Sequence, residues 1–519
     1  MSKVESGTRG SSVARNTLIV LAFSLMSKLL SLARESTIAA LAGTGVEADA
    51  YYMVLSIYHV LELGLSTSIF QSFFPIYRRM AVEQADEQKR MRFVNTAFTL
   101  LIICAVVLGV VELVSRELFI SVFAPGFSGD TRSLTGYLMI FSAPMLVFIV
   151  AAECVSAMLR AHDRFANSQA REVATHIAAI AVVLLLYRSY GVTALGVSML
   201  MGSLARLAIQ LPALHRIHKL RPAFDFRNAD VREMLRRIPA ILISTSSTQI
   251  KNIVAKMMAS MLPAGTVSAL NYGHRLESAL GGLLSTAMAT GMYPEMVALF
   301  VRNEKEKLSR LLYRAIQIFA LIVIPVCVGG FFTGEAIVSV VYQRGAFGAS
   351  EVQTTASVFV AYLLGTFFHG ASNIVSNIFF SAGNTKTPMI FNCVDLILNV
   401  VLSLVLMQFM GVVGLALAAS LSTMTVCCIR FVAVRRYLCL PEMSFWAEMG
   451  KFLAGALIAG FASNGLIGLL PVSSQIVRLG GVIAVFIPIY AGFLWLTRST
   501  SLRDGVAMVR RKLRRGRKA

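Results

Sequence analysis

The chain has 519 residues, of which 56% are hydrophobic and only 14% charged, and its formal net charge is +21. Soluble domains carry about 25% charged residues, so this composition excludes a protein built mainly of soluble domains. The basic residues lie in short gaps between apolar segments. That pattern argues against a nucleic-acid partner and is typical of a membrane protein with basic cytoplasmic loops.

The apolar segments are long enough to cross a bilayer, which takes roughly 20 residues per helix. The first follows a polar N-terminus without a small-residue cleavage site, so we interpret it as a span rather than a removed signal peptide. The predicted fold class is an all-α polytopic membrane protein with about 14 transmembrane helices. We expect them at residues 15–42, 48–76, 93–114, 134–159, 167–187, 193–214, 235–261, 267–299, 312–332, 352–381, 388–409, 412–434, 448–470 and 474–497.

The loops indicate an orientation for these spans. With the N-terminus in the cytoplasm, the loops on that side hold most of the 48 Lys and Arg residues, as the positive-inside rule requires. An even number of spans then places both termini in the cytoplasm. We expect the basic tail, residues 498–519, to lie against anionic lipid, and a role of the tail in binding a partner stays open.

An internal repeat divides the chain. The segment GLSTSIFQSFFP (64–75) resembles GLLSTAMATGMYP (282–294) at an offset of 219 residues, and APGF (124–127) resembles RGAF (344–347) at the same offset. An even number of spans separates the copies, so they form a parallel repeat, as in transporters with two related halves. The predicted organisation is an N-terminal lobe (1–220), a C-terminal lobe (221–437), two extra helices (438–497) and the tail (498–519).

Charged residues inside the spans indicate function. A charge at the centre of a spanning helix costs roughly 2.5–3.5 kcal/mol on insertion scales, so such residues normally face a pathway. They gather on the first two spans and on the seventh and eighth, which correspond in the repeat. Asn271, Arg275 and Ser278 follow helical spacing and form one polar stripe. The candidate substrate-binding residues are Lys28, Arg34, Asp49, Glu62, Lys251, Asn271, Arg275 and Ser278.

Other interpretations of these charges stay open. They can pair with one another, for example Arg34 with Asp49, and only hold the helices together. Asp49, Glu62 or Asp395 can instead bind a coupling ion or a proton. The sequence holds no phosphate-binding loop and no metal-ligand spacing, so we expect no cofactor and no ATP hydrolysis by this chain. The energy source cannot be read from the sequence, and the membrane potential and an ion gradient both stay open.

The remaining polar residues within spans have a structural interpretation. We expect Glu112, Glu153, Arg206 and Asp395 to make hydrogen bonds between helices. We interpret His59, His274 and His369 as hydrogen-bonded pocket residues rather than metal ligands. The seven cysteines lie in or beside apolar segments and are expected to be packing residues.

Several motifs, taken in order, resemble the MurJ/MviN family of lipid II flippases in the MOP exporter superfamily. They are SKLLSLARESTIAALAGTGVEADAYY (27–52), FQSFFPIY (70–77), APGF, LNYGHRL (270–276), VVYQRGAF (340–347), NTKTP (384–388) and NCVDLILN with GVVGLALAAS (392–420). The resemblance covers nearly the whole chain. It implies two pseudo-symmetric six-helix lobes plus two C-terminal helices, which would offer an apolar groove to a polyprenyl tail.

The resemblance also implies roles for individual residues. In the family, cavity arginines engage the diphosphate of the cargo, and an aspartate lies at the start of the second helix. Arg34, Asp49 and Arg275 match these positions. Lys28 stands where an arginine is usual, and Glu62 stands where another is expected.

The predicted function is therefore that of a flippase rather than an enzyme. It would move a polyprenyl-diphosphate-linked saccharide, in the first place lipid II, from the inner to the outer leaflet of the bacterial inner membrane by alternating access. The alternatives are a flippase for an exopolysaccharide or other lipid-linked oligosaccharide, a drug or small-molecule antiporter of the same superfamily, and a membrane-embedded transferase. Expected partners are the lipid-linked saccharide, membrane lipid and proteins of cell-wall or polysaccharide synthesis, but not nucleic acid.

Overall fold

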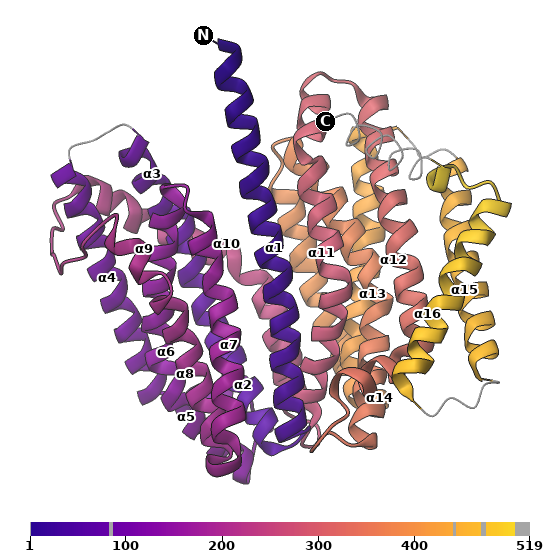
Figure 1. The fold of residues 1–519 in the computed structure, drawn as a ribbon, viewed down its shortest axis with the longest axis horizontal. Helices are drawn as coiled ribbons and strands as arrows, with labels where there is room; N and C mark the ends of the chain where they lie inside the picture. Colours follow the sequence, from indigo (N-terminus) through magenta and orange to yellow (C-terminus); the bar gives the residue numbers. More distant parts are fainter. Residues whose placement is uncertain (1, 83–86, 440–442, 469–473, 504–519) are drawn as a thin grey trace. The chain divides into compact units, whose positions relative to one another are not determined.

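The protein is helical throughout the part of the chain that the computed structural model describes, residues 2–82, 87–439, 443–468 and 474–503 (Figure 1). No strand occurs within these ranges, and the predicted all-α fold class is confirmed. Most of the predicted basic tail lies outside the described residues.

The chain divides into two compact units, Met1–Ser268 and Ala269–Ala519. The helices up to the end of the first unit are α1 (Ser2–Ala42), α2 (Val46–Ser68), the π-helix η1 (Ile69–Phe73), α3 (Phe74–Val82), α4 (Glu87–Val114), α5 (Arg116–Phe123), α6 (Gly129–Ala161), α7 (Phe165–Tyr190), α8 (Val192–Ala208), α9 (Leu211–His215) and α10 (Ala229–Ala259). The next helix, α11 (Thr266–Val301), begins in the first unit and continues into the second.

The second unit continues with five longer helices and one short 3₁₀ turn. They are α12 (Lys305–Tyr342), α13 (Ala349–Ser381), α14 (Lys386–Val434), η2 (Arg435–Tyr437), α15 (Met443–Gly468) and α16 (Gln475–Leu496). The division of the chain into compact units falls at Ser268. It does not test the lobe boundaries drawn from the sequence repeat, which stay a prediction. Helix α10, the seventh predicted span, packs against α2 and so belongs to the first unit.

Ten helices in the described ranges are long and apolar enough to cross a membrane, and the chain is a multi-pass membrane protein. One of them, α14, joins two helices across a kink at Gly411 (φ 54°) and so covers two of the predicted spans. Helices α1, α10 and α11 lie at three further predicted positions. The count of 14 spans stays a prediction.

Small residues let the helices of each unit approach closely, as is usual where lipid leaves no hydrophobic drive for association. In the first unit, a Cβ on Gly109 of α4 would lie 2.8 Å from the carbonyl oxygen of Ala143 on α6. In the second unit, a Cβ on Gly365 of α13 would lie 2.9 Å from the Cα of Ser420 on α14. Both units are therefore held by backbone contact as well as by side chains.

A π-helical segment interrupts the helix that begins with α2. Residues Ile69–Phe73 form η1, and the helix then continues as α3 through Pro75. Ile69 and Phe73 are buried in the apolar cluster of the first unit, whereas Gln71 is exposed. The π segment falls within the motif FQSFFPIY, and such segments are often found at functional positions.

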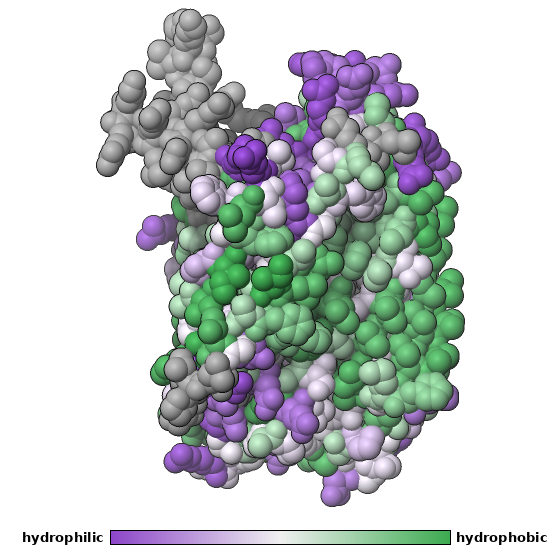
Figure 2. Space-filling model, turned by 90° about the vertical axis from the view of Figure 1, so that its right-hand side faces the viewer, coloured by the Kyte–Doolittle hydropathy of each residue, from purple (hydrophilic) through white to green (hydrophobic). Residues whose placement is uncertain are grey.

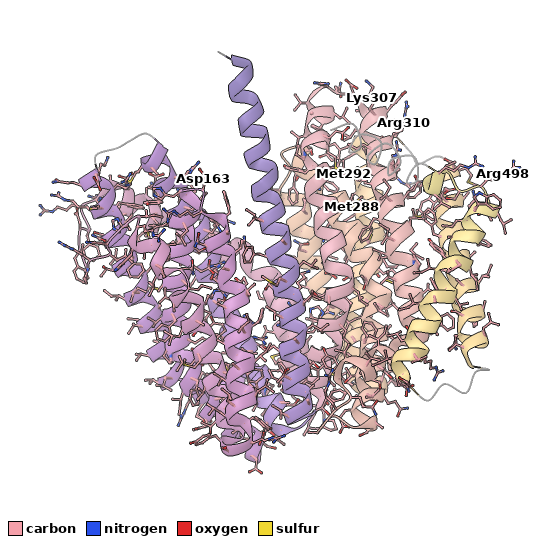
Figure 3. The ribbon with its side chains drawn as sticks, viewed as in Figure 1. Asp163, Met288, Met292, Lys307, Arg310 and Arg498 are labelled. Carbon is pink, nitrogen blue, oxygen red and sulfur yellow. The ribbon has the colours of Figure 1, made fainter. Side chains whose placement is uncertain are left out.

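The second unit has an apolar exterior and one distinctly basic end. The face that carries α15 and α16 is covered by apolar side chains between hydrophilic ends (Figure 2), and Phe461 and Ile487 on it are 67% and 60% exposed. Lys307, Arg310 and Arg498 lie at the same end of this unit (Figure 3). This agrees with an even number of crossings between Lys307 and Arg498.

Two methionines of α11 pack against the buried apolar cluster of the second unit. Met288 and Met292 project from α11 (Figure 3) and pack against a buried cluster that includes Phe319 of α12 and Phe379 of α13. Flexible thioether side chains suit such irregular contacts.

Candidate substrate-binding site

Arg34, the first predicted cargo residue, is anchored on one side by its neighbour. Its Nη2 lies 2.9 Å from Oε1 of Glu35, and the Arg34 side chain is 12% exposed. Glu35 is fully buried and also accepts a 2.5 Å hydrogen bond from the hydroxyl of Tyr52 on α2. The Nε of Arg34 is buried and has no hydrogen-bond partner among the described residues. One carboxylate thus orients a guanidinium that still has donors to offer.

Asp49 accepts hydrogen bonds from backbone N–H groups and does not pair with Arg34. Its Oδ2 accepts a hydrogen bond of 2.7 Å from the backbone N–H of Gly265, and its Oδ1 accepts one of 2.7 Å from that of Ser268. These amides belong to the start of α11, whose first N–H groups have no partner within the helix. Asp49 therefore caps α11, and the suggested Arg34–Asp49 pair is not what the structure shows, since Arg34 pairs with Glu35.

Glu62 lies in a polar network inside the first unit. Its Oε2 is 2.8 Å from Nδ1 of His59, one helical turn earlier on α2. Its Oε1 is 3.8 Å from Nη1 of Arg206 on α8, and both side chains are about one-tenth exposed. Glu62, which stands where the family resemblance leads us to expect an arginine, is thus balanced by an arginine of another helix.

The network extends through two further helices. Nη2 of Arg206 lies 2.6 Å from Glu153 on α6 and 3.0 Å from Glu172 on α7. Arg171, also on α7, lies 2.5 Å from the same oxygen of Glu153. The prediction that Glu153 and Arg206 link helices is confirmed. The sequence analysis missed Arg171 and Glu172, because charges near the start of a span look like loop residues.

The two predicted lysines of the first unit are half-buried, Lys28 on α1 and Lys251 on α10. One turn beyond Lys251, Lys256 donates a 2.8 Å hydrogen bond to Oγ of Ser56 on α2. Since α10 packs against α2, the cations of α10 and the polar face of α2 belong to the same part of this unit.

The predicted residues of the second unit lie on α11. Asn271 is buried, whereas Arg275 and Ser278 are half-buried, and the helical spacing of the three places them on one face. Nearby, Glu277 accepts a 2.8 Å hydrogen bond from Thr366 on α13 and lies 3.6 Å from Nδ1 of His274. A polar stripe on α11 is thus present as predicted, and its role in binding stays a prediction.

The second unit also holds an apolar cavity of about 910 Å³. It is lined by residues of α12, α13, α14, η2 and α15, and no residue of α16 lines it. The groove that the resemblance implies for the last two helices is therefore not this cavity, to which only α15 of the two contributes.

Metal chemistry has no evident place in these arrangements. Within the described ranges, no group of three or more His, Cys, Asp or Glu side chains is placed to hold a metal ion.

Comparison with known proteins decides the family. The model of the family described as lipid II flippase MurJ matches residues 38–490. The chain belongs to the MurJ family. A MurJ relative from Burkholderia cenocepacia, named lipid II flippase MurJ, is 24% identical over 500 residues, which are 93% of this chain and 97% of the relative. A probable lipid II flippase MurJ from Vibrio cholerae is 24% identical over 460 residues, 86% and 88% of the two chains.

Solved structures agree on the fold. A lipid II flippase MurJ in an inward closed conformation superimposes with a TM-score of 0.78 at 20% sequence identity, covering 92% of this chain and 99% of the other. An inward-facing multidrug resistance transporter of the MATE family, also in the MOP superfamily, gives a TM-score of 0.66 at 15% identity, covering 83% and 99%. The MurJ fold of this chain is thus shared with other transporters of that superfamily.

Proposed function

We propose that this chain is a lipid II flippase, which moves the peptidoglycan precursor from the inner to the outer leaflet of the bacterial inner membrane. The observation that carries this proposal is the match to the MurJ family over residues 38–490. The sequence resemblance implies in addition that Arg34 and Arg275 stand at positions of the family's cavity arginines. A member of this family is a transporter and not an enzyme. The named relatives are lipid II flippases, so they do not favour the exopolysaccharide alternative.

In this proposal Arg34 and Arg275 bind the cargo diphosphate. Guanidinium groups bind phosphate oxygens through paired, charge-assisted hydrogen bonds. Arg34 is suited to this because Glu35 fixes its orientation while its Nε is left without a partner among the described residues. Lys28 and Lys251 supply further positive charge, although as point charges without the planar fork of arginine.

The other predicted residues take supporting roles. Asn271 and Ser278 share the face of α11 with Arg275 and offer hydrogen bonds to the saccharide. Asp49 supports the site by capping the helix that carries Arg275. Glu62 supports it through its ion pair with Arg206. Alternating access, in which one part of the transporter moves against the other, exposes the cargo first to one side of the membrane and then to the other.

Orientation and energy supply complete the proposal. Both termini lie in the cytoplasm, in agreement with the basic residues at one end of the second unit (Figure 3). Transport needs no organic cofactor and draws on the membrane potential or an ion gradient. Proteins of cell-wall synthesis supply and consume the cargo on the two sides of the membrane.

Complementation tests the proposal. Bacteria depleted of their own lipid II flippase should survive when they express this chain, and should die with Arg34→Ala or Arg275→Ala at equal membrane abundance. Arg132→Ala serves as the control, because Arg132 forms an exposed pair with Glu117 and lies outside the predicted site. Failure of the abundant, inserted wild-type chain to rescue would contradict lipid II as the cargo. Survival with both arginine variants would contradict the binding role.

A further inference from the structure

The apolar cavity of the second unit is elongated along the helices. Its lining on α15 runs from Phe445 to Phe461, which corresponds to about 24 Å at 1.5 Å per residue. The hydrocarbon core of a bilayer is about 30 Å thick. The cavity therefore follows the helices through most of the depth that lipid chains occupy.

Polar groups line only one end of this cavity. Arg435, directly after the end of α14, and Tyr313 and Trp446, close to the starts of α12 and α15, line it there. Lys307 and Arg310 mark one end of the unit (Figure 3), and Tyr313 follows them within the first turns of α12. Further along, the lining consists of side chains such as Phe331 and Phe461. The cavity thus has one cationic end and an apolar body.

Two adjacent arginines at this end differ in what they contact. Arg436 stacks over the ring of Tyr437 at 4.8 Å and donates a 3.4 Å hydrogen bond to Thr387. Arg435 lines the cavity, and within the described ranges its exposed guanidinium has no hydrogen bond or ion pair. Arg435 is therefore available to a group that enters the cavity.

The cavity is also open to the surface and has space in it. Among its lining residues, Phe331, Trp446 and Phe461 are 57%, 56% and 67% exposed, and on a membrane-spanning helix such side chains meet lipid. A Cβ on Gly450, which also lines the cavity, would have no atom within 4 Å. A lipid can thus reach the cavity sideways from the bilayer.

We propose that this cavity is a binding site for one anionic phospholipid of the cytoplasmic leaflet. Its acyl chains lie along α12 and α15, and its phosphate accepts hydrogen bonds from Arg435. Charge complementarity selects this occupant, because a head group of net negative charge matches the end of the cavity that Arg435 lines, and hydrocarbon matches the apolar lining. Arg275 does not line the cavity, so a lipid with its phosphate at Arg435 is not a cargo held at Arg275. The assignment to the cytoplasmic leaflet rests on the orientation in the proposed function, whereas the lipid site itself does not depend on flippase activity.

The two tryptophans of the chain allow a direct test. Trp446 lines the cavity, whereas Trp495 on α16 does not, so the full chain carrying Trp495→Phe reports on the cavity alone. The protein is placed in phosphatidylcholine nanodiscs with a small, increasing fraction of phosphatidylglycerol that has brominated acyl chains, and Trp446 fluorescence is recorded. We expect quenching at a fraction about tenfold lower than with brominated phosphatidylcholine. A tenfold difference corresponds to about 1.4 kcal/mol, and it arises because the positive charge of choline lies beside Arg435 in phosphatidylcholine but not in phosphatidylglycerol.

Matched variants separate the site from bulk lipid. Arg435→Gln should abolish the head-group preference, and Arg436→Gln should keep it. Gly450→Phe should fill the cavity and remove the selective quenching. Gly465→Phe, on the same helix, also meets open space but lies outside the cavity, and should leave the quenching unchanged. Melting temperatures of all four variants check that they are folded.

Three results would overturn the proposal. One is equal quenching by both brominated lipids in the Trp495→Phe protein, which would mean ordinary lipid contact. Another is a preference that survives Arg435→Gln. The third is displacement of the brominated lipid by a polyprenyl diphosphate in a manner that requires Arg275, which would assign the cavity to the cargo tail. None of these results depends on whether the chain rescues flippase-depleted bacteria.

Discussion

Helices α2 and α11 each carry a histidine followed three residues later by a glutamate, yet the two pairs have different surroundings. In both pairs the histidine is close to half exposed and the glutamate is mostly buried. Glu62 of α2 is balanced by Arg206 within a network of ion pairs. Glu277 of α11 has a neutral partner, the hydroxyl of Thr366.

The difference shows which interactions stabilise the buried glutamate in each unit. A buried ion pair is costly to break, because removing one partner leaves the other charge uncompensated. A neutral hydrogen bond to a carboxylate contributes less and can be lost more cheaply. The first unit therefore depends on charge balance among α2, α6, α7 and α8. In the second unit, Thr366 contributes a neutral hydrogen bond to Glu277.

Breaking the charge balance should have the largest effect on stability. Arg206→Met removes the one guanidinium that contacts Glu62, Glu153 and Glu172, and we expect a loss of about 3–5 kcal/mol in the free energy of unfolding. Unfolding in mixed detergent micelles measures this. The double variant Arg206→Met with Glu153→Met should recover part of the loss. An unchanged stability for Arg206→Met would show that the network is not coupled.

Removing the cap on α11 should have an intermediate effect. Asp49→Ala leaves the backbone N–H groups of Gly265 and Ser268 without their acceptor, which should cost about 1–3 kcal/mol. Asp49→Asn keeps one carbonyl acceptor and should lose less. The same unfolding measurement ranks the three proteins. If Asp49→Ala is as stable as wild type while transport is lost, Asp49 acts on the cargo rather than as a cap.

Removing the neutral partner of Glu277 should have a smaller effect. Thr366→Val deletes the hydrogen bond to Glu277 and a longer one to the backbone carbonyl of Tyr362, and we expect a loss of about 1 kcal/mol, well below that of Arg206→Met. Thr354→Val on the same helix is the control, because the exposed Thr354 bonds only to its own helix backbone. Equal losses for Thr366→Val and Arg206→Met would contradict the contrast between the two units.

The weakest expected effect is a pH dependence of the first unit. Burial and the nearby Arg90, Arg164 and Arg78 lower the pKa of His162, which lies between α6 and α7 and contacts the hydroxyl of Tyr77. The unfolded chain, with a histidine pKa of about 6.5, then binds more protons than the folded one, so stability falls as pH drops below that value. The melting temperature should decrease from pH 8 to pH 5.5, and less so in His162→Gln.

Much of the fold could be predicted from the sequence, because long apolar segments and basic loops reflect the bilayer directly. The sequence also allowed two features of the site to be predicted. These are the polar stripe of α11 that includes Arg275, and the contact between helices made by Glu153 and Arg206. The partner of Arg34 was not, since adjacent residues of a helix do not normally face each other and yet Glu35 is that partner. The apolar cavity was not predictable either, because residues of α12 to α15, more than a hundred positions apart, line it together.

The π-helical segment η1 sets the rotational register of everything that follows it in its helix. A π turn accommodates one residue more than an α turn, and one residue corresponds to about 100° of rotation around a helix axis. Deleting the exposed Gln71 would convert Ile69–Phe73 to α-helix and turn α3 by about that angle. Tyr77 would then point away from His162, and Arg79 away from Asp230, its partner at 2.9 Å. One extra residue in a motif of aromatic side chains thus decides which face of α3 meets the rest of the first unit.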